Sequence, residues 1–239
     1  MNEELYEISH DLPENTPQDY VGHRQRLKER FLKGGPDALA DYEMLELVLF
    51  LGIPRGDVKP LAKELMRIYS SFAAIISAPI EKLLNHKGIG THAVFAIKII
   101  GAAAIRLARE QIINKPILSS WRLVLDYCHA NLAFAENEEF HVLYLDNKNR
   151  LITDEAHQKG TIDQASVYPR DIIKRCFELN ALSIVLVHNH PSGDPSPSKA
   201  DIEITKEINQ ITKLLGISIH DHLIIGKNGH ASFKSLGLL

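Results

Sequence analysis

The residues with the clearest potential for chemistry are two histidines separated by one residue and followed by an aspartate. His188 and His190 flank Asn189, and Asp201 follows after a short loop. In an extended segment, residues i and i+2 project from the same face, so both imidazoles can converge on one ion. A catalytic zinc ion typically has three such protein ligands and one further position. The spacing therefore predicts a metal site, and its ligand types favour zinc without excluding iron or manganese.

The identity of the third ligand depends on the loop between the histidines and the next helix. Residues 191–197 include three prolines and lead to a helix expected to begin at Ser198. A helix start there would turn Asp201 back toward the histidines, and Asp194 within the loop is the alternative ligand. Asp201 at the third position after Ser198 would also suit a capping box. The pair, the loop and the acid together favour the metal site.

The surrounding elements must bring these groups together. Residues 181–188 form a continuous apolar run of the kind found in buried strands, and it ends at the first histidine. Residues 140–145 are rich in β-formers and precede a turn-type cluster, with 151–161 as the returning strand. The pattern also predicts helices at 169–179 and 198–214 and a strand at 217–225. This mixture indicates an α/β sandwich of about 120 residues.

The first half of the chain has a different pattern. Residues 1–20 are polar and acidic and are expected to form a loose arm, and residues 22–109 have helical periodicity throughout. Residues 111–120 contain Pro116 and are expected to be a linker. The fold class is therefore α+β, with an all-α domain at residues 1–110 and an α/β domain at residues 118–239.

Composition limits the class of protein. The chain has 239 residues, 45% hydrophobic and 24% charged, with a formal net charge of -3. The chain therefore lacks the overall positive charge that would indicate a nucleic-acid partner. Residues 23–30 are locally basic, and we expect them to form a solvated helix face. Two cysteines exclude a disulfide framework. The start lacks the features of a secretory signal and the apolar runs are short, so we expect a cytoplasmic protein without a membrane partner.

The metal-site spacing resembles a known signature. His188, His190, Ser198 and Asp201 match the JAMM motif at every interval, and residues 188–201 closely resemble the bacterial RadC family. The similarity extends to Gly22-His23-Arg24, Val167-Tyr168-Pro169-Arg170 and residues 221–226. This resemblance implies an MPN-type (JAMM) zinc metallopeptidase domain after a helix-hairpin-helix-like domain.

The resemblance also implies roles for further residues. An upstream glutamate of JAMM enzymes deprotonates the attacking water, and Glu138 occupies that position, with Glu139 as the alternative. Successive strand residues face opposite ways, so only one of them can point at the metal. Ser198 is implied as the donor of a hydrogen bond to the oxyanion that develops in the reaction.

A second His-x-His pair lies near the end of the chain. His220 and His222 flank Asp221 on the last long predicted strand, and no spaced carboxylate follows them. A structural role at the end of the sheet is expected, with support of the zinc ligands as the alternative.

In the helical half, Gly88 and Gly90 bracket one apolar residue between two helices, as in helix-hairpin-helix turns. Glycines allow backbone amides at a helix start to approach a phosphate closely. With Lys87 beside the turn and Lys98 further along the helix, this is the candidate DNA contact. A tight interhelical turn would explain the same pattern.

Three functions remain open from the sequence. The first is a zinc metallopeptidase that cleaves a peptide or isopeptide bond in an unidentified peptide or protein substrate. The second is a DNA-processing factor in which the helical domain contacts DNA and the metal site cuts nucleic acid or an attached protein. The third is an interaction scaffold, which would not need the complete set of ligands and glutamate.

Overall fold

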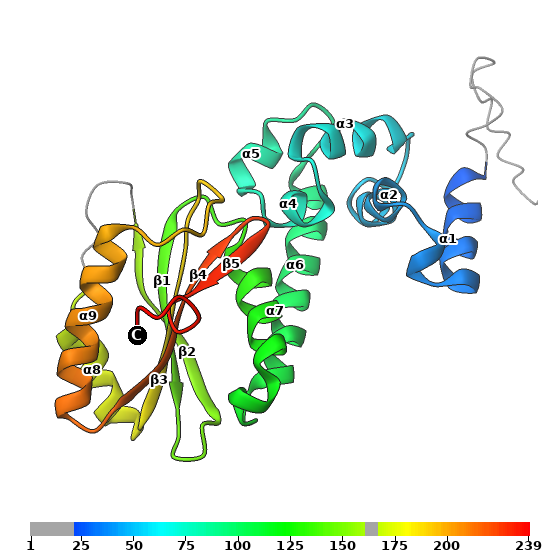
Figure 1. Ribbon diagram of the computed structural model, residues 1–239. Coiled ribbons are helices and arrows are strands. Elements are labelled where there is room, and N and C mark those ends of the chain that lie inside the picture. Colours follow the sequence, from blue (N-terminus) through cyan, green and yellow to red (C-terminus); the bar gives the residue numbers. More distant parts are fainter. Residues whose placement is uncertain (1–21, 161–166) are drawn as a thin grey trace, which may run out of the picture.

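The computed structural model describes residues 22–160 and 167–239 (Figure 1). The expectation of a loose arm at residues 1–20 lies outside the described residues. The N-terminal part is helical, as its periodicity predicted. Its elements are α1 (His23–Gly34), η2 (Pro36–Ala38), α2 (Asp41–Gly52), α3 (Lys59–Tyr69), α4 (Phe72–Ser77), α5 (Ile80–Leu84) and α6 (Thr91–Ile112).

The helical part has its own core. Leu45 and Leu49 of α2, Leu65 of α3 and Ile97 of α6 have no exposed side-chain surface. Helices α2 and α6 cross closely at Gly52, where an added Cβ would lie 2.4 Å from the Cα of Ala93. The C-terminal glycine of α2 is thus required by the approach of α6.

The locally basic segment of α1 is not a purely solvated helix face, because several of its side chains contact α2 and the residue after it. His23 Nε2 lies 2.7 Å from the carboxylate of Glu46, which is fully buried. Arg24 donates to the carbonyl of Ile53 at 2.8 Å, and Arg30 pairs with Glu43. These contacts hold α1 against α2, since a buried carboxylate needs a partner.

The C-terminal part is a three-layer sandwich. Its five-stranded sheet has the order β2-β1-β3-β4-β5, in which only the β3·β4 pair is parallel. Helices α8 and α9 cover one face, and α7 with the end of α6 covers the other (Figure 1). The elements are η3 (Ile117–Ser120), α7 (Trp121–Leu132), β1 (Glu138–Leu145), β2 (Leu151–Gly160), α8 (Pro169–Leu179), β3 (Ser183–Asn189), α9 (Lys199–Leu214), β4 (Ser218–Gly226) and β5 (Gly229–Ser232).

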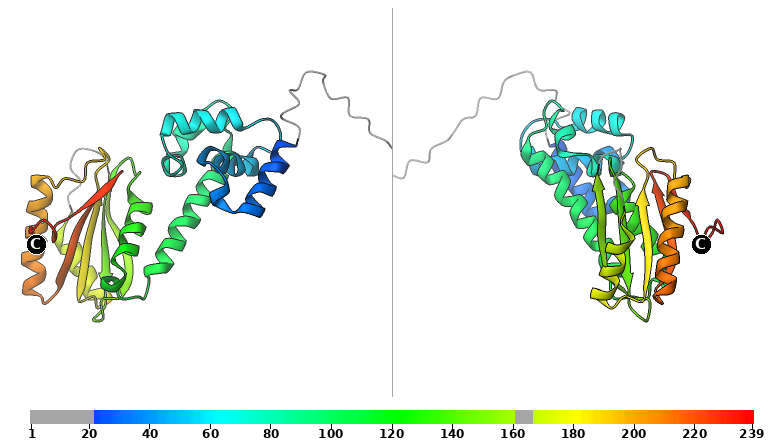
Figure 2. Two further views of the ribbon diagram at one scale, coloured as in Figure 1. Left: turned by 45° about the vertical axis from the view of Figure 1, so that its right-hand side comes forward. Right: turned by 90° about the vertical axis from the view of Figure 1, so that its left-hand side faces the viewer.

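Helix α6 joins the two parts as one continuous element (Figure 2). Its N-terminal half packs in the helical core, and Ile112 at its end is fully buried in the core of the sandwich. The expected linker at residues 111–120 is therefore not a free segment: Ile113 pairs with Leu151, and Ile117 is fully buried. Proline and paired serines suggested a linker, but the two isoleucines anchor this stretch.

Helix α6 also has the length and apolar composition to cross a membrane, which the short uninterrupted apolar runs did not indicate. Many core helices pass the same test; here the ends of α6 contribute to two cores, but only 22% of its most apolar window is buried. The α+β fold class is confirmed: a helical region precedes a sandwich with a mixed sheet.

Candidate metal centre

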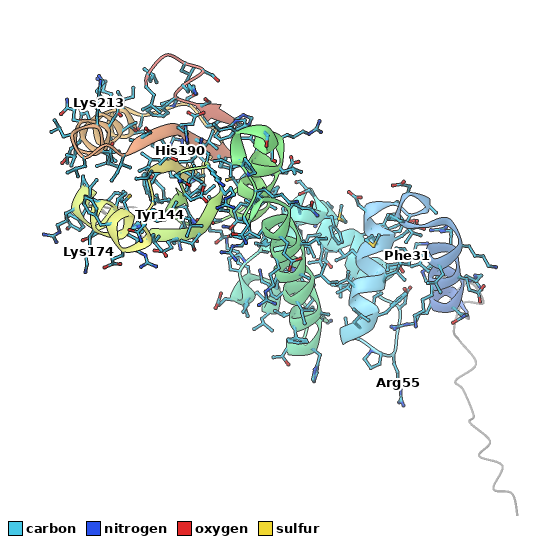
Figure 3. The ribbon with its side chains drawn as sticks, turned by 90° about the horizontal axis from the view of Figure 1, so that it is seen from below. Phe31, Arg55, Tyr144, Lys174, His190 and Lys213 are labelled. Atoms are coloured by element: carbon cyan, nitrogen blue, oxygen red, sulfur yellow. The ribbon has the colours of Figure 1, made fainter. Side chains whose placement is uncertain are left out.

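His188, His190 and Asp201 converge at one end of β3. One ligand atom from each lies within 4.8 Å of the other two. The Nε2 atoms of the two histidines are 3.0 Å apart, and each lies 3.3 Å from a carboxylate oxygen of Asp201. In Figure 3, His190 is labelled in the sandwich, well away from Phe31 and Arg55 of the helical part.

The end of β3 positions the two histidines. His188 is 1% exposed within the strand, and the backbone of His190 still donates to the carbonyl of Ile225 at 3.0 Å. The extended backbone therefore continues past the strand end, and both imidazoles project from the same face.

The loop after His190 folds over the end of β4. Gly193 has a φ of 91°, and an added Cβ at Gly226 would lie 2.4 Å from the carbonyl oxygen of Gly193. Asp194, the alternative third ligand, directs its carboxylate to the backbone and hydroxyl of Ser196 at 2.9 and 2.7 Å. It contributes to the site through its backbone carbonyl, which lies 2.8 Å from Nδ1 of His190.

Helix α9 delivers the aspartate. Ser198 is the N-cap, and its hydroxyl oxygen accepts a hydrogen bond from the backbone N–H of Asp201 at 3.1 Å. The carboxylate of Asp201 accepts in return from the backbone N–H of Ser198 at 2.7 Å. The capping box and the convergence on the histidines are thus compatible, because each carboxylate oxygen has more than one lone pair. The cap holds Asp201 in place.

The chemistry of this donor set fits a divalent cation. Because a carbonyl oxygen only accepts, Nδ1 of His190 is the protonated nitrogen and Nε2 carries the lone pair that faces the site. Burial alone would raise the pKa of Asp201, but the neighbouring imidazoles of His188 and His190 hold that pKa well below its usual range. The pKa of His190 is raised, chiefly by the carboxylate of Asp201 beside it. The three groups together favour a positive charge between them, as a catalytic zinc site requires.

The sheet register distinguishes the two candidate glutamates. Strand β1 pairs antiparallel with β3, with Phe140 opposite His188. Extending this register by two residues brings Glu138 opposite His190, and the charge of Glu138 is among the causes that raise the pKa of that histidine. The Glu139 carboxylate lies on the other face, 3.2 Å from Nε2 of His141. Glu138 is exposed and Glu139 is half-buried, so Glu138 is the accessible carboxylate on the face of the two histidines.

The side chain of Glu139 belongs to a buried polar network on the opposite face. His141 bridges Glu139 and Asp154, and Asp154 also accepts from the hydroxyl of Tyr127. Burial alone would lower the pKa of His141, but hydrogen bonds to the two carboxylates raise it to about 9. This network ties β1 to β2 and α7.

Asn189 connects the histidines to the segment before Glu138. Its side chain is 1% exposed and faces away from the metal ligands. Its amide oxygen accepts from the backbone N–H of Glu139 at 2.8 Å, and its amide nitrogen donates to the carbonyl of Asn137 at 3.0 Å. The residue between the two histidines therefore fixes the start of β1 relative to β3. Sequence reasoning passed over it, although an amide between two ligands on a buried strand was the available signal.

The second His-x-His pair divides between two environments. His220 lies 2.6 Å from the side-chain oxygen of Asn149, remote from the ligands, and Asp221 contacts Ser232 and the backbone of Lys234. His222 instead places Nε2 at 2.8 Å from Nδ1 of His188. A purely structural role therefore fits His220, whereas His222 contacts a metal ligand.

Of the four candidate DNA-contacting residues in the helical part, the structure brings only three together. Lys87, Gly88 and Gly90 lie exposed at the turn before α6, and Gly88 has a φ of 91°. Lys98 is elsewhere: its amine donates to the carbonyl of Ile76 at 3.1 Å. It lines a cavity of about 1050 Å³ between α4, α6 and α7. Lys98 therefore does not share a surface with the turn.

The layered sheet with two histidines at a strand end and an aspartate at the next helix start defines a JAB-type domain. Residues 118–238 match the family described as the RadC-like JAB domain, and residues 20–95 match the UPF0758 N-terminal family. A UPF0758 protein of Ruegeria pomeroyi is 51% identical over 217 residues, which cover 91% of this chain and 97% of the relative. A UPF0758 protein of Rhodobacter capsulatus is 51% identical over 213 residues, covering 89% and 100%. The chain belongs to the RadC (UPF0758) family, and the resemblance of the sequence to RadC is confirmed.

Proposed function

We propose that this protein is a zinc-dependent hydrolase of the JAMM metallopeptidase type that cleaves a peptide or isopeptide bond. The observation that carries the proposal is the convergence of His188, His190 and Asp201 on one point within 4.8 Å. The site lies at the end of a strand and is bordered by an exposed carboxylate, Glu138. Cys128 and Cys176 are free and buried, which supports a cytoplasmic location.

The residues of the site divide the chemistry among them. When bound, zinc would polarise the substrate carbonyl and make water more acidic. His188, His190 and Asp201 hold the ion. Glu138 takes a proton from the attacking water on its carboxylate and later gives it to the leaving nitrogen. Ser198 accepts from Asp201 through its oxygen, so its hydroxyl hydrogen is free to donate to the oxyanion of the substrate.

Metal removal tests this proposal. Purified protein should contain about one zinc per chain, as three protein ligands imply. On peptides from a proteome digest, it should create new amino termini that mass spectrometry detects. Stripping with a chelator should stop cleavage, and zinc alone should restore it. Cleavage that persists in metal-free protein would contradict the proposal, as would a protein that binds no zinc when supplied.

A second candidate function is DNA binding by the helical part, as expected of a DNA-processing factor. Residues 22–110 carry fourteen Lys and Arg against nine Asp and Glu, although the whole chain has a net charge of -3. The N-cap of α6 is Gly90, which provides no side-chain cap, so the first backbone N–H groups of the helix are open to an anion beside Lys87. Contact of this kind would be to phosphates and independent of sequence.

The DNA proposal predicts salt-dependent binding that requires Lys87. Duplex DNA should bind the intact chain weakly at high salt, and Lys87→Glu should weaken binding uniformly across sequences. The control is Lys213→Glu, at an exposed position in the last turn of α9, and this variant should bind as the wild type does. Fluorescence anisotropy in a salt series measures both. Equal affinities of the two variants would contradict contact at the hairpin.

A further inference from the structure

A continuous line of hydrogen bonds runs from the helix that carries Asp201 to the histidine that faces it. The hydroxyl of Thr205 on α9 donates to the carbonyl of Asp201 and also lies 2.6 Å from Nδ1 of His222. Nε2 of His222, on β4, lies 2.8 Å from Nδ1 of His188 on β3. A strand that bears no metal ligand thus links two elements that do.

The direction of each hydrogen bond follows from the ends of this line. The Asp201 carbonyl only accepts, so it takes the single hydroxyl hydrogen of Thr205. Thr205 must then accept from Nδ1–H of His222, which leaves the lone pair of His222 on Nε2. That lone pair accepts Nδ1–H of His188, and the lone pair of His188 is left on Nε2, facing His190 and Asp201. Each partner therefore fixes the tautomer of the next.

The ring of His222 cannot turn away from this arrangement. It has no exposed surface, and Thr205 is 1% exposed. Phe233 stacks on the ring with centroids 4.6 Å apart, and Phe140 contacts it edge-on at 5.6 Å.

We propose that Thr205 and His222 are positioning residues that hold His188 in the tautomer whose Nε2 can bind the metal. This proposal rests on the proposed function, which supplies the metal, but the tautomers of the two histidines can be observed in the metal-free protein. If His222 merely filled space, either of its tautomers would serve. Because the Nε2–H form of His222 would force a proton onto Nε2 of His188, only one of them leaves a ligand for the ion.

The test compares Thr205→Val with Thr205→Ser. Valine keeps the shape and removes the hydroxyl, so Nδ1–H of His222 loses its only acceptor along this line; serine keeps the hydroxyl. Long-range ¹H–¹⁵N spectra of metal-free, ¹⁵N-histidine-labelled protein report the tautomers. The wild type and Thr205→Ser should show His188 and His222 as Nδ1–H, and Thr205→Val should show mixed forms. Competition with a zinc chelator should show about 10- to 100-fold weaker zinc binding in Thr205→Val alone, as for other losses of a ligand's hydrogen-bond partner.

Two outcomes would overturn the proposal. One is an Nε2–H tautomer of His188 or His222 in the wild type, which needs no folded variant to observe. The other is zinc affinity in Thr205→Val equal to that of Thr205→Ser. A wild type that binds no zinc would instead contradict the proposed function. The tautomers of His188 and His222 would then still show whether the hydrogen bonds have the directions given above.

Discussion

The double variant His188→Ala/His190→Ala is expected to fold and to contain no zinc, whereas the wild type should contain about one zinc per chain. The two imidazoles provide two of the three converging ligand atoms, and a single carboxylate on a helix start cannot hold the ion in water. Elemental analysis of dialysed protein measures the content. Zinc at 100 times its Kd should stabilise the wild type by about 2.7 kcal/mol and leave the double variant unchanged.

The matched control is His220→Ala. This histidine is half-buried, as His190 is, and it is hydrogen-bonded to Asn149 rather than to the site. It should keep its zinc and its zinc-dependent thermal shift. Zinc retained by the double variant would place the ion elsewhere in the chain, and zinc lost from the control would show that the site responds to any change in this sheet.

The convergence of His188, His190 and Asp201 could be predicted from the sequence because its geometry is local. The period of two in an extended strand places His188 and His190 on one face whatever the rest of the fold does. Asp201 required one more assumption, a helix start at Ser198, which the capping pattern supported. Both readings of that pattern hold at once, since the same carboxylate caps α9 and faces the histidines.

The contacts of His222 and Lys98 could not be predicted in this way, because they depend on pairing between distant elements. His222 reaches His188 only because β3 and β4 are parallel neighbours joined through α9, and their register contains an irregularity. Lys98 lies on the face of α6 that lines the cavity, and helical periodicity alone does not show which neighbour covers which face. The expected linker failed for the same reason: the burial of Ile112 and Ile117 is set by the sandwich.

The choice between Glu138 and Glu139 could be predicted only in part from the sequence. Alternation along a strand shows that they face opposite ways, and only the pairing of Phe140 with His188 shows which of them faces the ligands. Asn189 then fixes this register at its end through the backbone N–H of Glu139. The structure therefore offers a pair of adjacent, chemically identical residues as variant and control.

Glu138→Gln is expected to lower the rate of hydrolysis by about 10²- to 10⁴-fold, the usual contribution of a positioned general base, without loss of zinc. Glutamine keeps the size of the side chain and removes its ability to take a proton, and none of the three converging ligands is altered. The rate is measured on a peptide identified in the digest screen, with zinc content measured in parallel.

Glu139→Gln should hydrolyse that peptide at the wild-type rate, because its side chain faces His141 on the other side of the sheet. Its effect should fall on stability, since the buried His141 loses the charge of one carboxylate partner. A wild-type rate in Glu138→Gln would exclude Glu138 as the base. Loss of zinc from that variant would instead make Glu138 a ligand, and an equal loss of rate in both variants would trace the effect to the start of β1 rather than to either carboxylate.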